Sequence, residues 1–315
     1  MIYPKFIQDK STIGVVAPSF GVAGEPYYDN YIIAKESLQE MGFRLVECPS
    51  IYNLEKGQSN LPKIRAKELM DFYEDDSIDF LWSCAGGEIM NEILPYLDFE
   101  RIKQLKPKWF IGYSDNTCFI QPLATKSNIA SLYGMCISEF NSLQIKEASQ
   151  ALINLLMGKQ HLFYQFLDQP TQTITNENTM IEGRLLGGCV EVIMNLLQTQ
   201  YDGTLAFIEQ YEGDVILYLE AYELNSLGMK RTLWQLRELG YLNKIKGILI
   251  GKLRNDEPAF DVTITEALLD LKLDIPVIYD VEFGHTYPTI PMVNGAYAKV
   301  SVINQRFSID YDFTR

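Results

Sequence analysis

The chain has 315 residues, of which 47% are hydrophobic and 22% are charged. At roughly 150 residues per domain this length predicts about two domains, and the composition excludes disordered and fibrous proteins. The net charge of −14 argues against binding to nucleic-acid phosphates as the main activity. The chain has only two histidines, His161 and His285, which excludes a multi-histidine metal site and leaves two candidates for a catalytic imidazole.

The five cysteines are scattered singly along the chain, without a CxxC pair. This spacing is typical of neither a zinc site nor a disulfide scaffold, and an odd number of unpaired thiols is typical of a reducing compartment. Residues 1–10 lack the apolar segment of a signal peptide, and no run approaches the roughly 18 apolar residues of a membrane span. We therefore expect a soluble, cytoplasmic protein.

The first half of the chain alternates between predicted strands and helices. The apolar, β-branched run at residues 11–18 predicts a strand buried on both faces, as in parallel sheets. Further strands are predicted at residues 43–47, 78–84 and 109–112, and helices at residues 28–41 and 64–74. Gly42 follows the first helix, where a glycine commonly ends a helix. Repeated strand–helix units of this kind indicate a parallel sheet.

The pattern weakens between residues 140 and 182. Residues 147–157 predict an amphipathic helix, and the polar stretch at residues 160–178 predicts a connection between two domains. Beyond it, strands are predicted at residues 215–219, 245–253 and 276–281, and a last strand of alternating pattern at residues 298–303. Helices are predicted at residues 190–197 and 230–239. We expect an N-terminal α/β domain at residues 1–165 and a C-terminal domain at residues 175–315.

The segment FIGYSDNT at residues 110–117 is the sharpest local signal for chemistry. An apolar strand runs into Gly112, and Ser114 and Asp115 precede residues that can begin a helix. Such a turn lifts a serine hydroxyl clear of a sheet and directs backbone N–H groups at one point. Asn116 replaces the second glycine of the G-x-S-x-G form. Alternatively, Ser114 or Asp115 caps the next helix.

A pair of glycines, Gly86 and Gly87, follows the strand at residues 78–84. Paired glycines at the end of a strand let the backbone approach a ligand and donate N–H groups to an anion, although they also form simple tight turns. Because ligands of open α/β sheets bind at the carboxyl ends of the strands, we expect this turn and Ser114 at the same edge. The two turns are then suited to an oxyanion hole beside a nucleophile.

A serine nucleophile needs a base and usually an acid that orients the base. His285 lies in the loop EFGHTYP after a predicted strand, whereas His161 lies in the predicted connection, where packing among aromatic residues is favoured. The strand VILYLE ends in Glu220, a carboxylate that is costly to bury unless it is paired. Glu223 is close by, and spacing alone does not choose between the two glutamates.

Several ordered sequence blocks carry a family resemblance. They are TIGVVAPS at residues 12–19, NEILPYLDF at 91–99, PKWFIGYSDNT at 107–117, IEGRLLGGCVEVIMNLL at 181–197, ILYLE, IKGILIGK, and FGHTYPTIPMVNGA at 283–296. The chain resembles the serine LD-carboxypeptidases over nearly its whole length, and within them the branch that contains the microcin C immunity proteins. The resemblance implies an α/β fold with a Rossmann-like, parallel-sheet N-terminal domain, a smaller C-terminal α/β domain and an active site between them.

The resemblance also implies the roles of the site residues. Ser114 would be the nucleophile, His285 the general base and acid, and Glu220 the acid that orients the histidine. The oxyanion hole would come from the amides of Gly87 and Asp115, and substrate contacts from Gly86 and Glu88. Family members commonly form homodimers and use no metal or cofactor. A small peptide or peptidyl-nucleotide is therefore the expected partner, and neither nucleic acid nor a membrane is expected.

Two substrate classes follow from the resemblance. Family members that act in peptidoglycan recycling remove the terminal D-alanine from an LD-linked murein tetrapeptide. The immunity branch cleaves the amide between a peptidyl or aminoacyl group and a nucleotide-like adenylate analogue. Residues 83–91 depart from both patterns, since an arginine common before the paired glycines is absent and Glu88 begins an altered segment. These departures concern specificity and leave the triad intact.

We therefore expect a serine peptidase that releases a terminal D-amino acid from murein-type peptides through an acyl-enzyme. The first alternative is an immunity-type hydrolase acting on peptidyl or aminoacyl nucleotide analogues. The second is a catalytically silent protein that binds a peptide or nucleotide, although such a protein would not require all three triad residues. A nucleotide-dependent dehydrogenase is disfavoured because no G-x-G-x-x-G follows the first strand.

Overall fold

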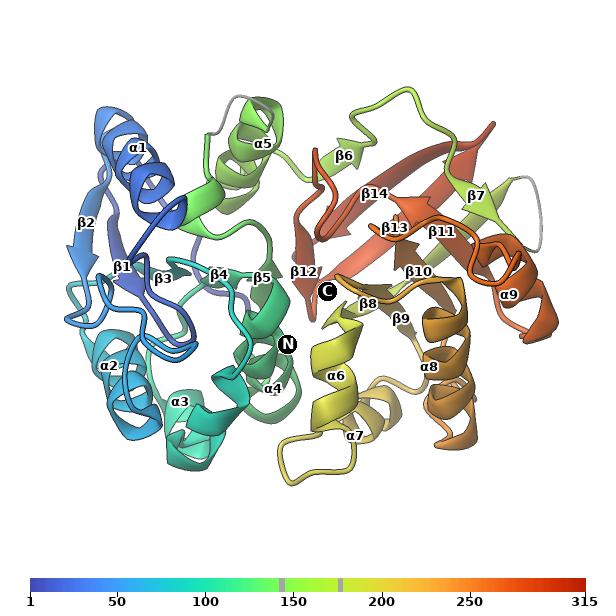
Figure 1. Cartoon of the computed structure of the whole chain (residues 1–315), viewed down its shortest axis with the longest axis horizontal. Helices are drawn as coiled ribbons and strands as arrows, with labels where there is room; N and C mark the ends of the chain where they lie inside the picture. Colours follow the sequence, from blue (N-terminus) through green and yellow to red (C-terminus); the bar gives the residue numbers. More distant parts are fainter. Residues whose placement is uncertain (142–144, 175–177) are drawn as a thin grey trace.

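The computed structural model describes residues 1–141, 145–174 and 178–315. Two sheets lie side by side, each accompanied by helices, and both ends of the chain lie near the junction between the two halves (Figure 1). None of the described helices is long and apolar enough to cross a membrane.

The sheet of the N-terminal half has six strands in the order β12-β5-β4-β3-β1-β2. Its members are β1 (Thr12–Val16), β2 (Arg44–Glu47), β3 (Phe80–Ser83), β4 (Phe110–Gly112), β5 (Ser131–Tyr133) and β12 (Met292–Asn294). The first five strands are parallel, and β12 pairs antiparallel with β5. A strand from near the end of the chain thus completes the sheet that carries the predicted nucleophile.

Helices cover both faces of this sheet, with α1 and α5 above it and α2, α3 and α4 below it in the view of Figure 1. Their bounds are α1 (Tyr27–Glu40), α2 (Pro62–Glu74), α3 (Phe99–Gln104), α4 (Thr117–Ser127) and α5 (Lys146–Leu156). Three short 3-10 helices accompany them: η1 (Met90–Tyr96), η2 (Ser114–Asn116) and η3 (Ile137–Glu139). Helix α4 also contacts β8 (Thr179–Cys189) and α6 (Val190–Leu196) of the second half, so it links the two halves.

The sheet of the C-terminal half has eight strands in the order β6-β14-β13-β8-β9-β10-β11-β7. Its members are β6 (Leu162–Tyr164), β7 (Gln172–Thr173), β8 (Thr179–Cys189), β9 (Val215–Glu220), β10 (Gly247–Gly251), β11 (Val277–Val281), β13 (Tyr297–Ile303) and β14 (Arg306–Asp312). Strands β8 to β11 are parallel, and the outer strands are antiparallel to their neighbours. The accompanying helices are α6 (Val190–Leu196), α7 (Thr204–Gln210), α8 (Ser226–Glu238) and α9 (Ile264–Asp270).

The burial of each strand follows its sequence pattern. Every residue of β1, β3, β9 and β10 is buried, as expected for parallel strands that are covered on both faces. Strands β13 and β14 instead alternate between buried and more exposed residues, as expected for antiparallel strands with one open face. The apolar runs and the alternating run therefore distinguish the inner strands from the outer ones.

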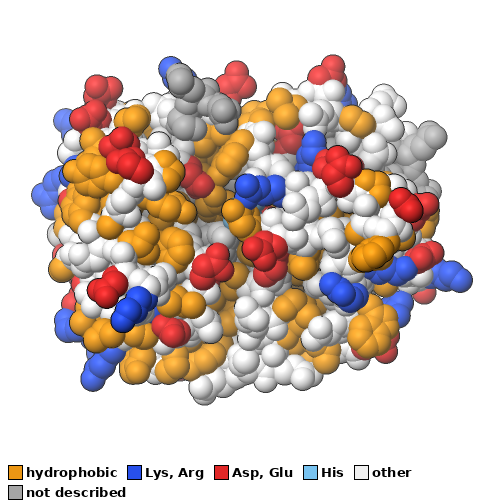
Figure 2. Space-filling model, viewed as in Figure 1, with side chains coloured by type: hydrophobic (Ala, Val, Ile, Leu, Met, Phe, Trp, Pro, Cys, Tyr) orange, Lys and Arg blue, Asp and Glu red, His pale blue; other side chains and the backbone are white. Residues whose placement is uncertain are grey.

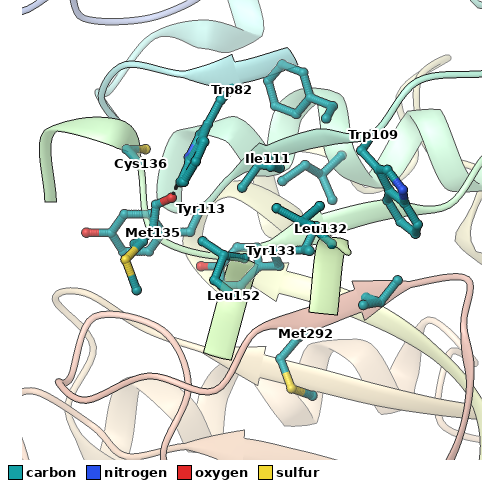
Figure 3. Close-up of a cluster of buried hydrophobic side chains, with 14 of the residues drawn as sticks. Trp82, Trp109, Ile111, Tyr113, Leu132, Tyr133, Met135, Cys136, Leu152 and Met292 are labelled. Carbon is teal, nitrogen blue, oxygen red and sulfur yellow. Dashed lines mark hydrogen bonds between the residues drawn. The ribbon is translucent and has the colours of Figure 1, made fainter. Parts of the chain in front are cut away.

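A cluster of large side chains fills the core beside β4 and β5 (Figure 3). Trp82 is fully buried and donates a hydrogen bond of 2.8 Å from its indole nitrogen to the carbonyl of Met135. Met292 of β12 packs in the same cluster and comes from the far end of the chain. Burial of such side chains is the main source of the stability of this half.

The α/β class and the mostly parallel N-terminal sheet are confirmed. The predicted strands and helices are present with somewhat different ends, but two expectations need correction. The strand at residues 298–303 is not the last, because β14 follows it as the second arm of an antiparallel pair. The stretch at residues 160–178 is not a plain connection, because it contains β6 and β7, and its residues 175–177 lie outside the described residues.

The division into domains at residues 1–165 and 175–315 stays a prediction. Strand β6 precedes residue 165 but pairs with β14 of the second sheet. Strand β12 lies well beyond residue 175 but pairs with β5 of the first sheet. A strand from each of the two predicted domains therefore pairs with the sheet of the other, so the predicted boundary does not separate the two sheets.

Candidate active site

A cleft of about 510 Å³ lies between the two halves. Side chains and backbone from both halves line it, including Gly86, Gly87, Glu88, Ser114, Asp115 and His285. The structure therefore brings these predicted site residues together. Glu220 lies directly behind His285 and is almost completely buried.

Ser114 lies in the turn that joins β4 to α4. Its φ of +59° is in the left-handed region, which non-glycine residues seldom adopt and which often marks a functional turn. Its backbone N–H donates a hydrogen bond of 3.2 Å to the hydroxyl of Tyr133. Helix α4 begins at Thr117 with Asn116 as its N-cap residue, so neither Ser114 nor Asp115 holds the capping position.

Asn116 stands where the G-x-S-x-G form has its second glycine, and its backbone is right-handed helical (φ −61°, ψ −13°), a conformation that does not require glycine. The residue is fully buried, and its side-chain amide donates to the carbonyls of Ala85 at 3.2 Å and Tyr113 at 3.0 Å. A Cβ atom on Gly112 would lie 2.8 Å from the Asn116 side chain, so Gly112 makes room for it. Asn116 thereby joins the turn after β4 to the turn after β3.

The Gly86–Gly87 turn packs directly against the serine. A Cβ atom on Gly86 would lie 3.3 Å from the Cβ atom of Ser114. Gly87 has a φ of +154°, and a Cβ atom there would lie 2.0 Å from the hydroxyl oxygen of Ser19. Both the conformation and the close approach require glycine at position 87.

The Asp115 carboxylate holds the neighbouring loops in place. It is 3% exposed and accepts hydrogen bonds from the Ser19 hydroxyl at 2.5 Å and from the Met90 N–H at 2.8 Å. Burial raises the pKa of Asp115 in spite of these donors and the nearby guanidinium of Arg65. The side chain of Asp115 therefore organises the turns, which leaves its backbone N–H as the group available to a ligand.

Glu220 and His285 form a buried pair. The Glu220 Oε2 atom lies 2.8 Å from His285 Nδ1 and also accepts the backbone N–H of His285 at 3.2 Å. Gly284 permits this contact, because its φ is +93° and a Cβ atom there would lie within 2.5 Å of the Glu220 carboxyl group. Glu223, the alternative left open by spacing, is exposed at the rim of the cleft.

The imidazole of His285 is enclosed by two aromatic rings. Its centroid lies 4.7 Å from the ring of Tyr113 and 4.8 Å from the ring of Tyr222. Burial lowers the pKa of His285, but the hydrogen bond and charge of Glu220, together with the charges of Glu139 and Glu191, raise it above its ordinary value of 6.5. A carboxylate that orients an imidazole and stabilises the imidazolium formed when the ring accepts a proton is the arrangement that supports a general base.

A second carboxylate, Glu139, lies in the same cleft and was missed by sequence reasoning. Its Oε1 atom accepts hydrogen bonds from the hydroxyls of Tyr113 and, at 2.7 Å, Tyr287, and its Oε2 atom accepts the Cys136 N–H at 3.2 Å. Burial raises the pKa of Glu139 in spite of these donors. No sequence pattern around Glu139 indicates a site residue. Tyr287 lies two residues after His285, and this proximity is a signal that could have identified it as part of the site.

The other histidine lies in an aromatic packing site. The ring centroid of His161 is 5.9 Å from that of Phe6 and 5.4 Å from that of Phe313. The expectation of aromatic packing for His161 is therefore confirmed. The five cysteines are all free and buried, so no disulfide links them.

Carboxylates outnumber cationic groups in the lining of the cleft, which contains Glu88, Asp115, Glu139, Glu191 and Glu223. Among the described residues of this lining, Arg254 is the only lysine or arginine, and its guanidinium lies 4.5 Å from the centre of the Tyr222 ring. Partial burial and the neighbouring carboxylates raise the pKa of Glu88. The space-filling view also shows acidic side chains near the middle of the face, where the halves meet (Figure 2).

Despite these carboxylates, no group of three or more His, Cys, Asp or Glu within the described ranges is arranged to hold a metal ion.

Two family models match the chain. A model of the LD-carboxypeptidase N-terminal domain matches residues 13–134, and a model of the LD-carboxypeptidase C-terminal domain matches residues 182–300. The chain is 25% identical to the Microcin C7 self-immunity protein MccF of Escherichia coli, over 87% of this chain and 86% of the relative. It is 24% identical to the murein tetrapeptide carboxypeptidase of Pseudomonas aeruginosa, over 70% of this chain and 72% of the relative.

The fold is also shared with a solved structure. The crystal structure of an MccF-like protein from Bacillus anthracis superposes with a TM-score of 0.85 at 21% identity, covering 99% of each chain. This likeness confirms the expected arrangement of the two α/β halves. Because the two family models together match both halves, the chain belongs to the LD-carboxypeptidase family.

Proposed function

We propose that this protein is a serine peptidase of the LD-carboxypeptidase type, which releases a terminal D-amino acid from murein-type peptides through an acyl-enzyme. The observation that carries the proposal is the hydrogen-bonded Glu220–His285 pair at the wall of the cleft into which Ser114 opens. A serine in a strained turn, an imidazole and an orienting carboxylate are together the parts of a nucleophilic hydrolase.

The reaction has two halves. In acylation, the Ser114 hydroxyl oxygen attacks the substrate carbonyl carbon while its proton passes to His285 Nε2. The tetrahedral intermediate collapses as His285 returns the proton to the departing amine, and the C–N bond breaks. In deacylation, His285 removes a proton from water, the resulting hydroxide attacks the ester, and the proton returns to Ser114.

The oxyanion of each intermediate would be held by the backbone N–H groups of Gly87 and Asp115. The N–H of Ser114 is already donated to Tyr133, and the side chain of Asp115 is held by Ser19 and Met90. The first observation disfavours the N–H of Ser114 as a donor, and the second favours the backbone N–H of Asp115 over its side chain as the group that meets a ligand. Each such donor is worth about 3 kcal/mol of transition-state stabilisation.

The charged groups of the cleft support a substrate that carries both ammonium and carboxylate groups, as a murein-type peptide does. Several carboxylates line the cleft and would attract an ammonium group. Arg254 at the rim could bind the single carboxylate of a departing D-amino acid. The name of the relative from Pseudomonas aeruginosa, a murein tetrapeptide carboxypeptidase, agrees with this choice.

A second candidate is hydrolysis of aminoacyl nucleotide analogues. MccF has been solved in complex with aspartyl sulfamoyl adenosine, and an MccF-like protein from Streptococcus pneumoniae in complex with AMP. The observation in its favour is that Phe20, Tyr27 and Tyr222 line the cleft with flat rings against which a base can stack. The homodimer and the cytoplasmic location stay predictions, as does the binding-protein alternative.

The deciding experiment compares two substrates and two variants. Purified protein is given an LD-linked murein tetrapeptide and an aminoacyl-sulfamoyl adenosine, and the release of D-alanine or of the sulfamoyl nucleoside is measured. We expect faster turnover of the tetrapeptide, and its loss in Ser114→Ala. Preferred turnover of the nucleoside would move the function to the second candidate.

Ser114→Ala with full activity would reject the mechanism for both substrates. A fluorophosphonate probe then separates an enzyme from a binding protein, since it labels only an activated serine. We expect labelling of the wild type at Ser114 and none in the variant. An unlabelled wild type that still binds the tetrapeptide would identify a catalytically silent binding protein.

A further inference from the structure

Tyr133 lies where the N-terminal and C-terminal halves of the molecule meet. It lies at the end of β5, where its partner on one side is Gly112 of the nucleophile strand β4 and its partner on the other is Met292 of β12. Its side chain is 1% exposed and packs in the core cluster beside Tyr113 (Figure 3). Nothing in the local sequence distinguishes Tyr133 from other strand residues.

The hydroxyl of Tyr133 makes two hydrogen bonds that join the predicted catalytic groups. It accepts the backbone N–H of Ser114 at 3.2 Å and donates to Glu220 Oε1. The other oxygen of Glu220 holds His285 at 2.8 Å. One hydrogen-bonded path therefore runs from the nucleophile turn of the first sheet to the acid–base pair of the second.

Both ends of this path need the hydroxyl. Glu220 is 1% exposed, and a buried carboxylate oxygen without a donor is costly. Ser114 has a strained backbone, and the bond to its N–H restrains the turn. Tyr133 comes from the first sheet and Glu220 from the second, so the hydroxyl also sets the relative position of the two walls.

We propose that Tyr133 is a positioning residue for catalysis, which fixes the Glu220 carboxylate relative to the Ser114 turn and moderates the charge that Glu220 presents to His285. The proposal rests on the proposed function, because it assumes that Ser114 and His285 perform the reaction. Tyr133 does not touch the substrate or the reacting atoms. It acts through Glu220 and the backbone of Ser114.

The chemistry of the phenol fits this role. Burial and the charge of Glu220 raise the pKa of Tyr133 well above its ordinary value of 10.0, so the hydroxyl stays protonated and remains a donor. A donor on Oε1 withdraws negative charge from the carboxylate and weakens its pull on the imidazole proton. Removal of the hydroxyl is therefore expected to raise the pKa of His285 further.

Other groups near His285 also affect its pKa. The carboxylates that act on His285 besides Glu220 are Glu88, Glu139 and Glu191, and the rings that pack against it are Tyr113 and Tyr222. A Tyr133→Phe substitution leaves all of them unchanged. A shift of the pH profile in that variant would therefore report the lost bond to Glu220.

The test is Tyr133→Phe, with Tyr218→Phe as the matched control. Tyr218 is also fully buried, lies 5.8 Å from the ring of Tyr133 and is close to Glu220, but its hydroxyl has no hydrogen-bond partner among the described residues. We expect Tyr133→Phe to lower kcat roughly tenfold to a hundredfold with KM within about twofold, as for loss of a hydrogen bond to a charged group. Tyr218→Phe should retain wild-type kinetics.

The pH profile separates positioning from packing. The acid limb of kcat/KM is expected to move to higher pH in Tyr133→Phe and to stay in place in Tyr218→Phe. An acid limb that does not move, or that moves to lower pH, overturns the proposal, and so does an equal loss of kcat in the two variants. In either case the proposed function stands if wild type turns over substrate and Ser114→Ala does not.

If Tyr133→Phe does not fold, fluorotyrosine at position 133 decides the question. This side chain keeps the packing and makes the hydroxyl a stronger donor, so the acid limb is expected to move to lower pH. An unchanged limb with this side chain overturns the proposal.

Discussion

The nucleophile wall of the cleft is built from two turns at the ends of neighbouring strands, whereas the acid–base wall joins residues that are 65 positions apart. In the first wall, Gly86 and Gly87 follow β3 and Ser114 follows β4, and because these strands pair in parallel the two turns lie at the same edge. In the second wall, Glu220 ends β9 and His285 follows β11, with β10 lying between the two strands. The first wall thus depends on two adjacent strands, whereas the second depends on the order of three strands, β9, β10 and β11, in the C-terminal sheet.

This difference predicts how each wall responds to substitution. The nucleophile wall is held by backbone conformation and close approach, so added atoms should disrupt it. The acid–base wall is held by one buried carboxylate, so a change of its charge should be enough to inactivate it.

Glu220→Gln should have the largest effect. The amide keeps the shape of the carboxylate but no longer stabilises the imidazolium, so kcat is expected to fall roughly 10³- to 10⁴-fold, as for orienting acids in other serine hydrolases. Steady-state hydrolysis of the tetrapeptide measures the loss. Glu223→Gln is the matched control, because Glu223 is exposed at the rim and should change kcat by less than about threefold. Equal losses in the two variants would show that Glu220 has been assigned wrongly.

Gly87→Ala should have the next largest effect. A methyl group at this position would meet the Ser19 hydroxyl, so the turn must shift and carry the Gly87 N–H away from the oxyanion position. We expect a loss of about 3 kcal/mol in the free energy of unfolding and at least about a hundredfold loss in kcat.

Gly42→Ala is the control for the backbone alone. Gly42 also has a positive φ, of +96°, but a Cβ atom there would have no atom of the described residues within 4 Å. This variant should lose about 1 kcal/mol of stability and retain full activity. Denaturant titration and kinetics of both variants separate conformational strain from close approach. A Gly87→Ala variant that behaves like Gly42→Ala would contradict the close packing at Ser19.

The pH dependence should show the smallest effect and tests how the two walls interact. His285 must be neutral to act as a base, so kcat/KM should rise with pH through the raised pKa of His285 and level off above it. The acid limb is therefore expected above pH 6.5. Glu139→Gln removes a negative charge contributed by the first half, and should move the limb to lower pH by about half a unit. A limb below pH 6.5 in the wild type would contradict the effect assigned to Glu220.

Much of the fold could be predicted because local conformation is encoded in local pattern. The apolar runs of β1, β3 and β9 and the alternating run of β13 were recognised from their periodicity, and Gly42 marked the end of α1. Some short strands were missed. β5 and β12 have only three residues each and no prediction covers them, although both shape the site.

The site likewise contains residues that the sequence predicts and residues that it does not. Ser114, the glycine pair and His285 were found because each sits in a turn with an unusual sequence, and the family blocks selected Glu220 over Glu223. The contacts of Tyr133 and Glu139 were not predictable. Each is an ordinary residue in its own segment, and acquires partners only when sheets or loops from distant parts of the chain meet.

The amino-acid sequence by itself determined the α/β class, the two strand-to-loop turns and the family, because these depend on residue periodicity, on glycine conformations and on ordered blocks. The tertiary structure alone decided that β12 returns to complete the first sheet, that Tyr133 bridges Ser114 and Glu220, and that carboxylates crowd the cleft around His285. The physical reason is that these contacts are set by the order and register in which strands pair, and no local pattern of side chains records which strands will be neighbours.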